Sequence, residues 1–165
     1  MYAVYKNNLY FFSDSIVVGR RLLTRKKEKT DDSFYFEDGD YIKQLDNLDE
    51  ISDIYSLRFF VTYTDQYFKS GSILEVRPKW NAHYDVNAED HIVDLFVSAR
   101  CEENGWEMLD NYSSHKNLKL SECTGFFLKY KYEKHNGVAC DNEEIDLPVT
   151  KAIFVSAISE YFENI

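Results

Sequence analysis

Two aromatic segments limit the possible folds of this chain more than any other part of the sequence. In each of them, an extended backbone would place successive side chains on opposite sides, with most of the apolar ones on one side. Gly125 to Tyr132 reads Gly-Phe-Phe-Leu-Lys-Tyr-Lys-Tyr, and Leu57 to Thr64 reads Leu-Arg-Phe-Phe-Val-Thr-Tyr-Thr. A period of two residues is typical of a β-strand that buries one face. We therefore expect these aromatic segments to form the centre of a sheet, and neither contains a catalytic motif.

Three short sequences predict tight hairpin turns between further strands. Asn7-Asn8, Asp38-Gly39 and Asn136-Gly137 each lie between runs of apolar residues. Asn, Asp and Gly tolerate the left-handed backbone conformation that two-residue hairpin loops require. Strands joined by such turns are antiparallel, so the sequence predicts a largely antiparallel sheet.

Apolar residues spaced three to four apart predict three helices. The first is a short helix from Asp46 to Tyr55 that turns its carboxylates toward solvent, and the two main helices span Asn87 to Asn104 and about Pro148 to Glu163. Helices that interrupt runs of strands are typical of α+β proteins. We expect a single α+β domain over residues 1–165, with two main helices packed on one curved, mostly antiparallel sheet of hairpins.

Four shorter segments complete the expected fold. Ile16 to Gly19 predicts a short strand, and Leu118 to Glu122 predicts a strand that pairs with the Gly125 segment. Lys79 to Val86 and the acidic segment Asp141 to Asp146 are expected to be loops.

The net charge of the chain is −10, and it is unevenly distributed. Arg20 to Lys29 contains six basic residues and one acid, so the other residues together carry −15. We expect this basic segment to be a solvated loop or a mobile strand end, because clustered like charges repel, with a nucleic-acid contact as the alternative. The acidic balance argues against DNA, RNA and anionic membranes as partners and suits a basic protein.

The cysteines indicate the compartment. Cys101, Cys123 and Cys140 show no ligand spacing, and an odd number of cysteines is typical of free thiols in a reducing environment. The N-terminal residues lack the basic start and apolar run of a signal peptide, and no apolar run approaches membrane length. These observations predict a cytoplasmic protein.

No combination of residues in the sequence indicates catalysis or a bound metal. The histidines lack the i, i+4 pair of a zinc helix; they are His83, His91, His115 and His135. The segment from Asp85 resembles a calcium loop, but it has Asp90 where Gly is required and Phe96 where Glu is required. Because nucleophile motifs and phosphate-binding loops are also absent from the sequence, we expect a non-enzymatic protein without a cofactor.

Clusters of acidic residues are the candidate partner-binding site. Carboxylates steer a cationic partner toward a surface, and Tyr or Trp side chains can anchor the contact. The candidate residues are Glu37, Asp38, Asp40, Asp46, Asp49, Glu50, Asp53, Asp141, Glu143 and Glu144.

In size, acidity, aromatic content and absence of motifs, the chain resembles the immunity proteins of bacterial contact-dependent growth inhibition and related polymorphic toxin systems. The resemblance implies a partner, because members of that group bind and neutralise one toxin domain, which is often a basic nuclease. Their folds vary and they share no motif, so the resemblance transfers no individual residue to this chain.

Three hypotheses follow. The leading one is a cytoplasmic immunity protein that covers the active site of a cognate toxic nuclease domain, with an RNase favoured. The second is an acidic mimic of nucleic acid that inhibits a host DNA-binding enzyme. The third is an RNA- or single-strand-binding module that uses Arg20 to Lys29.

Overall fold

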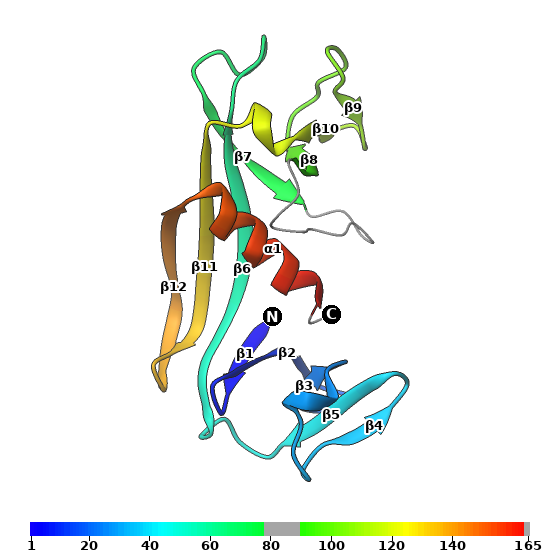
Figure 1. Ribbon diagram of the computed structural model, residues 1–165, viewed down its shortest axis with the longest axis vertical. Coiled ribbons are helices and arrows are strands. Elements are labelled where there is room, and N and C mark those ends of the chain that lie inside the picture. Colours follow the sequence, from blue (N-terminus) through cyan, green and yellow to red (C-terminus); the bar gives the residue numbers. More distant parts are fainter. Residues whose placement is uncertain (78–89, 164–165) are drawn as a thin grey trace. The chain divides into compact units, whose positions relative to one another are not determined.

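The computed structural model describes residues 1–77 and 90–163, and these residues form two compact units (Figure 1). Unit 1 comprises Met1–Leu57, Tyr130–Ile145 and Tyr161–Ile165, and unit 2 comprises Arg58–Lys129 and Asp146–Glu160. Strands β6 (Ile51–Tyr63), β11 (Gly125–His135) and β12 (Val138–Val149) contribute residues to both units. The predicted loop at residues 79–86 lies outside the described residues, as does His83.

Unit 1 is built from hairpins. Its remaining strands are paired in the order β4-β5-β3-β2-β1, and β1 pairs with β6. Their bounds are β1 (Tyr2–Tyr5), β2 (Asn8–Ser15), β3 (Gly19–Thr24), β4 (Tyr35–Glu37) and β5 (Asp40–Leu45), with a 3-10 turn at Lys27–Lys29. Positive φ angles at Asp38 and Gly39 and at Asn136 and Gly137 confirm two of the predicted hairpin turns, whereas the first turn is formed by Lys6 and Asn7, one residue earlier than predicted, with Asn8 paired to Tyr5.

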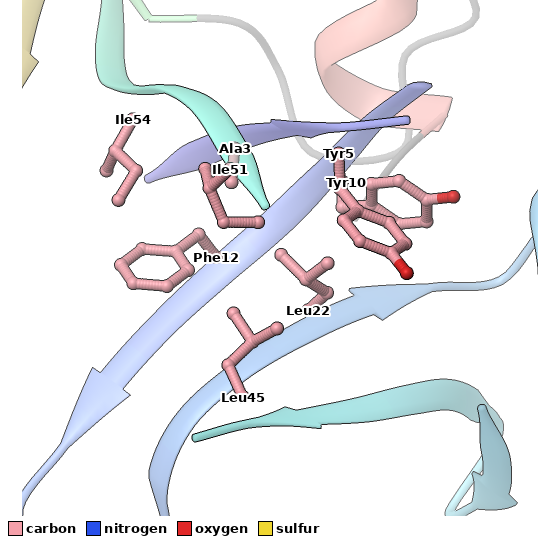
Figure 2. Packing of buried hydrophobic residues seen from close by; sticks show 8 residues of the cluster. All are labelled: Ala3, Tyr5, Tyr10, Phe12, Leu22, Leu45, Ile51 and Ile54. Atoms are coloured by element: carbon pink, nitrogen blue, oxygen red, sulfur yellow. The ribbon is translucent and has the colours of Figure 1, made fainter. Parts of the chain in front are cut away.

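The core of unit 1 lies on one face of these strands. Figure 2 shows its eight buried side chains, which come from β1, β2, β3, β5 and β6. They are Ala3, Tyr5, Tyr10, Phe12, Leu22, Leu45, Ile51 and Ile54. Met1, Phe34 and Leu48 pack against this cluster, and Phe34 stacks on the ring of Tyr10 at a centroid distance of 5.5 Å. Aromatic residues therefore fill much of this core, as the composition suggests.

Unit 2 continues from the second half of β6. Its strands are paired in the order β6-β7-β8-β10-β9, and β11 pairs with β6 and β12. Their bounds are β7 (Ser72–Arg77), β8 (Ile92–Val97), β9 (Glu107–Met108) and β10 (Ser114–Lys119), followed by a 3-10 turn at Leu120–Glu122. Phe59, Val61 and Tyr63 are buried while Phe60 and Thr62 are not, which confirms the alternation predicted for this segment.

The C-terminal helix α1 (Lys151–Glu163) confirms one of the two predicted main helices. Thr150 begins it, because the amide of Ile153 donates to the Thr150 hydroxyl and the amide of Phe154 donates to the Thr150 carbonyl. The ring of Phe154 is fully buried in unit 2, with centroids 5.7 Å from Phe59 and 5.3 Å from Phe126. Ile153, which was expected on the apolar face, is 52% exposed instead.

The prediction of an α+β fold with two main helices is wrong, because the fold is mostly antiparallel β-sheet. Within the described part of Asn87 to Asn104, the regular element is strand β8 and not a helix. Val93, Leu95 and Val97 are buried on one side of β8, and Ile92 is exposed on the other. β-branched residues at three of its six positions favour this extended structure.

The short helix predicted from Asp46 to Tyr55 is also wrong. The segment is a turn that leads into β6 at Ile51. The side-chain oxygen of Asn47 accepts the amide of Asp49 at 2.9 Å, and this local bond competes with helix formation.

Four further expectations need correction. Ile16 to Val18 form the loop between β2 and β3, not a strand. The acidic segment 141–146 belongs to strand β12 and not to a loop. Leu118 lies in β10, which pairs with β8 and β9 and not with the Gly125 strand. The expectation of a solvated loop or a mobile strand end at Arg20 to Lys29 is correct only in part, because its first half lies in β3 and includes the buried Leu22 and Thr24.

Candidate functional site

All ten candidate acidic residues lie in unit 1, where the structure distributes them over three places. Glu37, Asp38 and Asp40 lie at the β4–β5 hairpin, and Asp141, Glu143 and Glu144 lie on β12. The other four lie between β5 and the start of β6. All are exposed except Asp40 and Asp53, which are half-buried.

A concave site of about 370 Å³ brings three of these acids together, and we call it the acidic pocket. It is lined by Lys43, Gln44, Leu45, Asp46, Asn47, Asp49 and Glu50. Within residues 1–77 and 90–163, the carboxylates of Asp46, Asp49 and Glu50 have no ion-pair partner. Their negative charge is therefore open to a cation from outside the protein.

The backbone of the turn fixes the position of these carboxylates. Leu48 packs on the core of unit 1, and its carbonyl accepts the amide of Ile51 at 3.1 Å and the ammonium of Lys134 at 2.6 Å. Because Leu48 points inward, the neighbouring acids on this turn point outward. Lys43, the one cation that lines the pocket, donates to the hydroxyl of Ser33 at 2.8 Å.

Asp53 has a different role from the one predicted for it. Its carboxylate accepts hydrogen bonds from the hydroxyl of Ser52 (2.7 Å) and the amide of Asn136 (3.1 Å), and it lies 3.0 Å from Nδ1 of His135. Burial acts to raise the pKa of Asp53, but these hydrogen bonds and the His135 ring outweigh it and lower that pKa. Asp53 therefore holds the β11–β12 turn against β6, and its carboxylate is half-buried instead of turned fully to solvent.

The basic segment is partly neutralised by unit 1 itself. Arg20 forms an ion pair with Asp14 at 3.1 Å, and Arg25 forms one with Asp40 at 3.4 Å. The carbonyl of Lys29 accepts a hydrogen bond from the Tyr10 hydroxyl, so the end of the segment is attached to β2. These contacts explain why the segment is ordered despite its like charges, and they reduce the cationic surface that it offers to nucleic acid.

Unit 2 has a second concave site, of about 400 Å³, that is apolar. It is lined by Phe60, Ile73, Phe127, Lys129, Asp146 and Pro148, with an ion pair of 3.4 Å between Lys129 and Asp146. The sequence interpretation missed this site. Two residues in the alternating segments could have indicated it, because Phe60 and Phe127 are aromatic on the side of each segment that otherwise carries polar residues.

The described histidines lie beside one or two carboxylates or in the core, and Nε2 of His115 lies 3.7 Å from Glu107. Nδ1 of His115 lies 2.9 Å from Asp94, and His91 is 7% exposed. Across residues 1–77 and 90–163, no three His, Cys, Asp or Glu side chains are grouped so that they could hold a metal ion.

The three thiols are unpaired, and their environments predict different reactivities. Burial raises the pKa of Cys123 to about 12; burial and the neighbouring Glu143 also raise the pKa of Cys140, but that thiol is only partly buried and so is accessible in the folded protein. Since the thiolate is the reactive form, we expect a disulfide reagent at pH 8 to label Cys140 first and Cys123 only after unfolding. Mass spectrometry of timed samples measures this order, and early labelling of Cys123 would contradict it.

Comparisons with protein-family models, with curated proteins and with solved structures find no match. In the described part of the chain, no helix has both the length and the apolar character needed to cross a membrane.

Proposed function

We propose that this chain is a cytoplasmic immunity protein that binds a cognate basic nuclease domain, an RNase, and covers its active site. The observation that supports this proposal is the acidic pocket, where three carboxylates without ion-pair partners among the described residues surround a concave surface. Although Lys43 also lines the pocket, the three carboxylates leave it with a net negative charge, and net charge in a depression concentrates the field and attracts the opposite charge.

The pocket matches the chemistry of a nuclease active site. Nucleases bind phosphates through Lys and Arg side chains, and Arg forms paired hydrogen bonds with carboxylates as it does with phosphates. A site of about 370 Å³ accommodates a cationic side chain. Asp46, Asp49 and Glu50 would then occupy the positions of substrate phosphates and exclude RNA from the bound enzyme.

Co-expression tests the proposal directly. We expect the preceding reading frame to encode a large secreted protein with a small basic C-terminal domain, and that domain is the probe. We expect that domain to stop bacterial growth when expressed alone, and co-expression of this chain to restore growth. The purified pair should form a complex without RNase activity. Full RNase activity in an excess of this chain would overturn the proposal, and inhibition of a host DNA-binding enzyme instead would favour a nucleic-acid mimic.

Charge reversal in the acidic pocket should slow association with that toxin domain. We expect Asp49→Lys with Glu50→Lys to lower the association rate constant by about tenfold at low salt, because steering by pocket charges contributes to encounter. The effect should shrink at high salt, since screening shortens to about 8 Å at physiological ionic strength. Stopped-flow fluorescence at several salt concentrations measures both quantities.

The matched control is Glu28→Lys with Asp32→Lys, which changes the net charge equally at two exposed acids outside the pocket. It should slow association less than the pocket reversal does. Both double variants should retain the stability of the parent within about 0.5 kcal/mol per substitution, because exposed side chains contribute little to folding. Equal effects of the two reversals would show that net charge, not the pocket, attracts the partner.

A further inference from the structure

The loop between β2 and β3 presents three consecutive β-branched aliphatic residues to solvent. Ile16 is fully exposed, Val17 is 90% exposed and Val18 is 40% exposed. We call Ile16–Val18 the apolar tip. Single apolar side chains are common on protein surfaces, but a contiguous exposed group at the end of a hairpin is typical of an interaction site.

Several contacts hold the base of the apolar tip. The amide of Val17 donates to the hydroxyl of Ser15 at 3.2 Å, and the side-chain amide of Gln44 donates to the carbonyl of Val18 at 3.1 Å. Gly19 closes the loop with φ of +72°, and a Cβ there would lie 2.7 Å from Nε2 of Gln44. The tip is therefore pre-organised, so that docking it would cost little conformational entropy.

The apolar tip adjoins the acidic pocket. Gln44 bonds to Val18 and also lines the pocket, so one side chain belongs to both features. The strand register explains this proximity, because Arg21 on β3 pairs with Gln44 on β5 and Arg20 pairs with Leu45. Unit 1 therefore presents an apolar projection next to a negatively charged depression.

We propose that the apolar tip is the hydrophobic anchor of the partner interface, and this inference rests on the proposed function. Ile16 and Val17 would enter an apolar cleft on the basic toxin domain while the acidic pocket takes a cation at the rim of that cleft. Stable protein interfaces combine an apolar centre with a charged and polar rim, and the tip and pocket supply one of each. The negative charge of the pocket favours a basic protein as the partner, because it would repel anionic lipid headgroups and nucleic acid.

The test replaces Ile16 and Val17 together by serine, which removes apolar surface without changing the charge. The probe is the purified basic toxin domain of the preceding reading frame. We expect the double variant to bind it at least about 30-fold more weakly, because two buried aliphatic side chains are lost from the contact. The loss should appear mainly in faster dissociation, whereas reversal of Asp49 and Glu50 should act mainly on association.

The matched control is Val138→Ser, which removes an exposed aliphatic side chain from another hairpin of unit 1. Its affinity should stay within about twofold of the parent, and circular dichroism should show all three proteins equally folded. If the parent binds the toxin domain and the tip variant binds it equally well, the anchor inference is overturned while the proposed function stands. If the parent itself does not bind, the proposed function is overturned and the anchor with it. If the parent binds phosphatidylglycerol vesicles and the tip variant does not, the inference that the tip contacts a protein is also overturned.

Discussion

Replacing Phe154 with alanine is expected to lower the free energy of unfolding by about 3–5 kcal/mol. The ring is completely buried in unit 2, where it makes an edge contact with the ring of Phe59 and a tilted contact with the ring of Phe126. Removing it takes away the burial energy of a large side chain and leaves a cavity beneath α1, which neighbouring side chains fill only in part.

Urea denaturation followed by tryptophan fluorescence measures this loss, since Trp106 is buried in unit 2. The control is Ile153→Ala, one residue earlier on the same helix, where the side chain is half exposed and the expected change is about 0.5 kcal/mol. Similar losses from both substitutions would mean that α1 does not pack on unit 2 through Phe154.

The strands and turns were predictable because their signals are local. The alternation in Leu57 to Thr64 reflects burial of one face, and β6 has that pattern. Asp38-Gly39 and Asn136-Gly137 form two-residue turns with positive φ at both positions, which few other residue pairs adopt easily. Neither signal depends on a partner that is distant in the sequence.

The false helix at Asp46 to Tyr55 has a physical cause. The pairing of β1 with β6 shifts register between Val4 and Tyr5, so that β6 has one extra residue at this point. Because of this bulge, Ile51 and Ile54 both reach the core although they are three residues apart. A spacing of three imitates helical periodicity, and only the pairing partner distinguishes the two cases.

The false helix after Asn87 has another cause. Ile92 to Val97 is almost continuously apolar, and such a run fits a helix face and a buried strand equally well. The register decides in favour of a strand, since β8 pairs with β7 and β10 on its two sides. That pairing is non-local, so periodicity alone could not reveal it.

The candidate site was predictable only in part. The clustering of acidic residues in the sequence made Asp46, Asp49 and Glu50 candidates, and all three line one pocket. The same reasoning included Asp53, because a carboxylate bound to a remote hairpin turn cannot be distinguished from an exposed one without the fold. The residues of the apolar tip were predicted to form a strand, because three β-branched residues before a glycine fit a strand as well as a loop.

Replacing Asp53 with alanine is the other substitution with a large expected effect, a loss of about 2–3 kcal/mol of stability. Hydrogen bonds to a charged group contribute more than neutral ones, and here the donors at Ser52 and Asn136 would lose their acceptor together. Asp53→Asn should cost less, because its side-chain oxygen still accepts, and Asp49→Ala in the acidic pocket should change stability by less than about 0.5 kcal/mol.

The loss caused by Asp53→Ala should depend on pH in one direction. The hydrogen bonds lower the pKa of Asp53 in the folded protein below its ordinary value of 3.8, which the unfolded chain retains. The contribution of the carboxylate is therefore complete above that ordinary value and disappears as the pH falls through the folded pKa. Urea unfolding of the parent and the variant should thus give a clear difference at pH 5 and a shrinking one below about pH 4. A difference that persisted unchanged to pH 2 would mean that Asp53 stabilises the turn through packing and not through its charge.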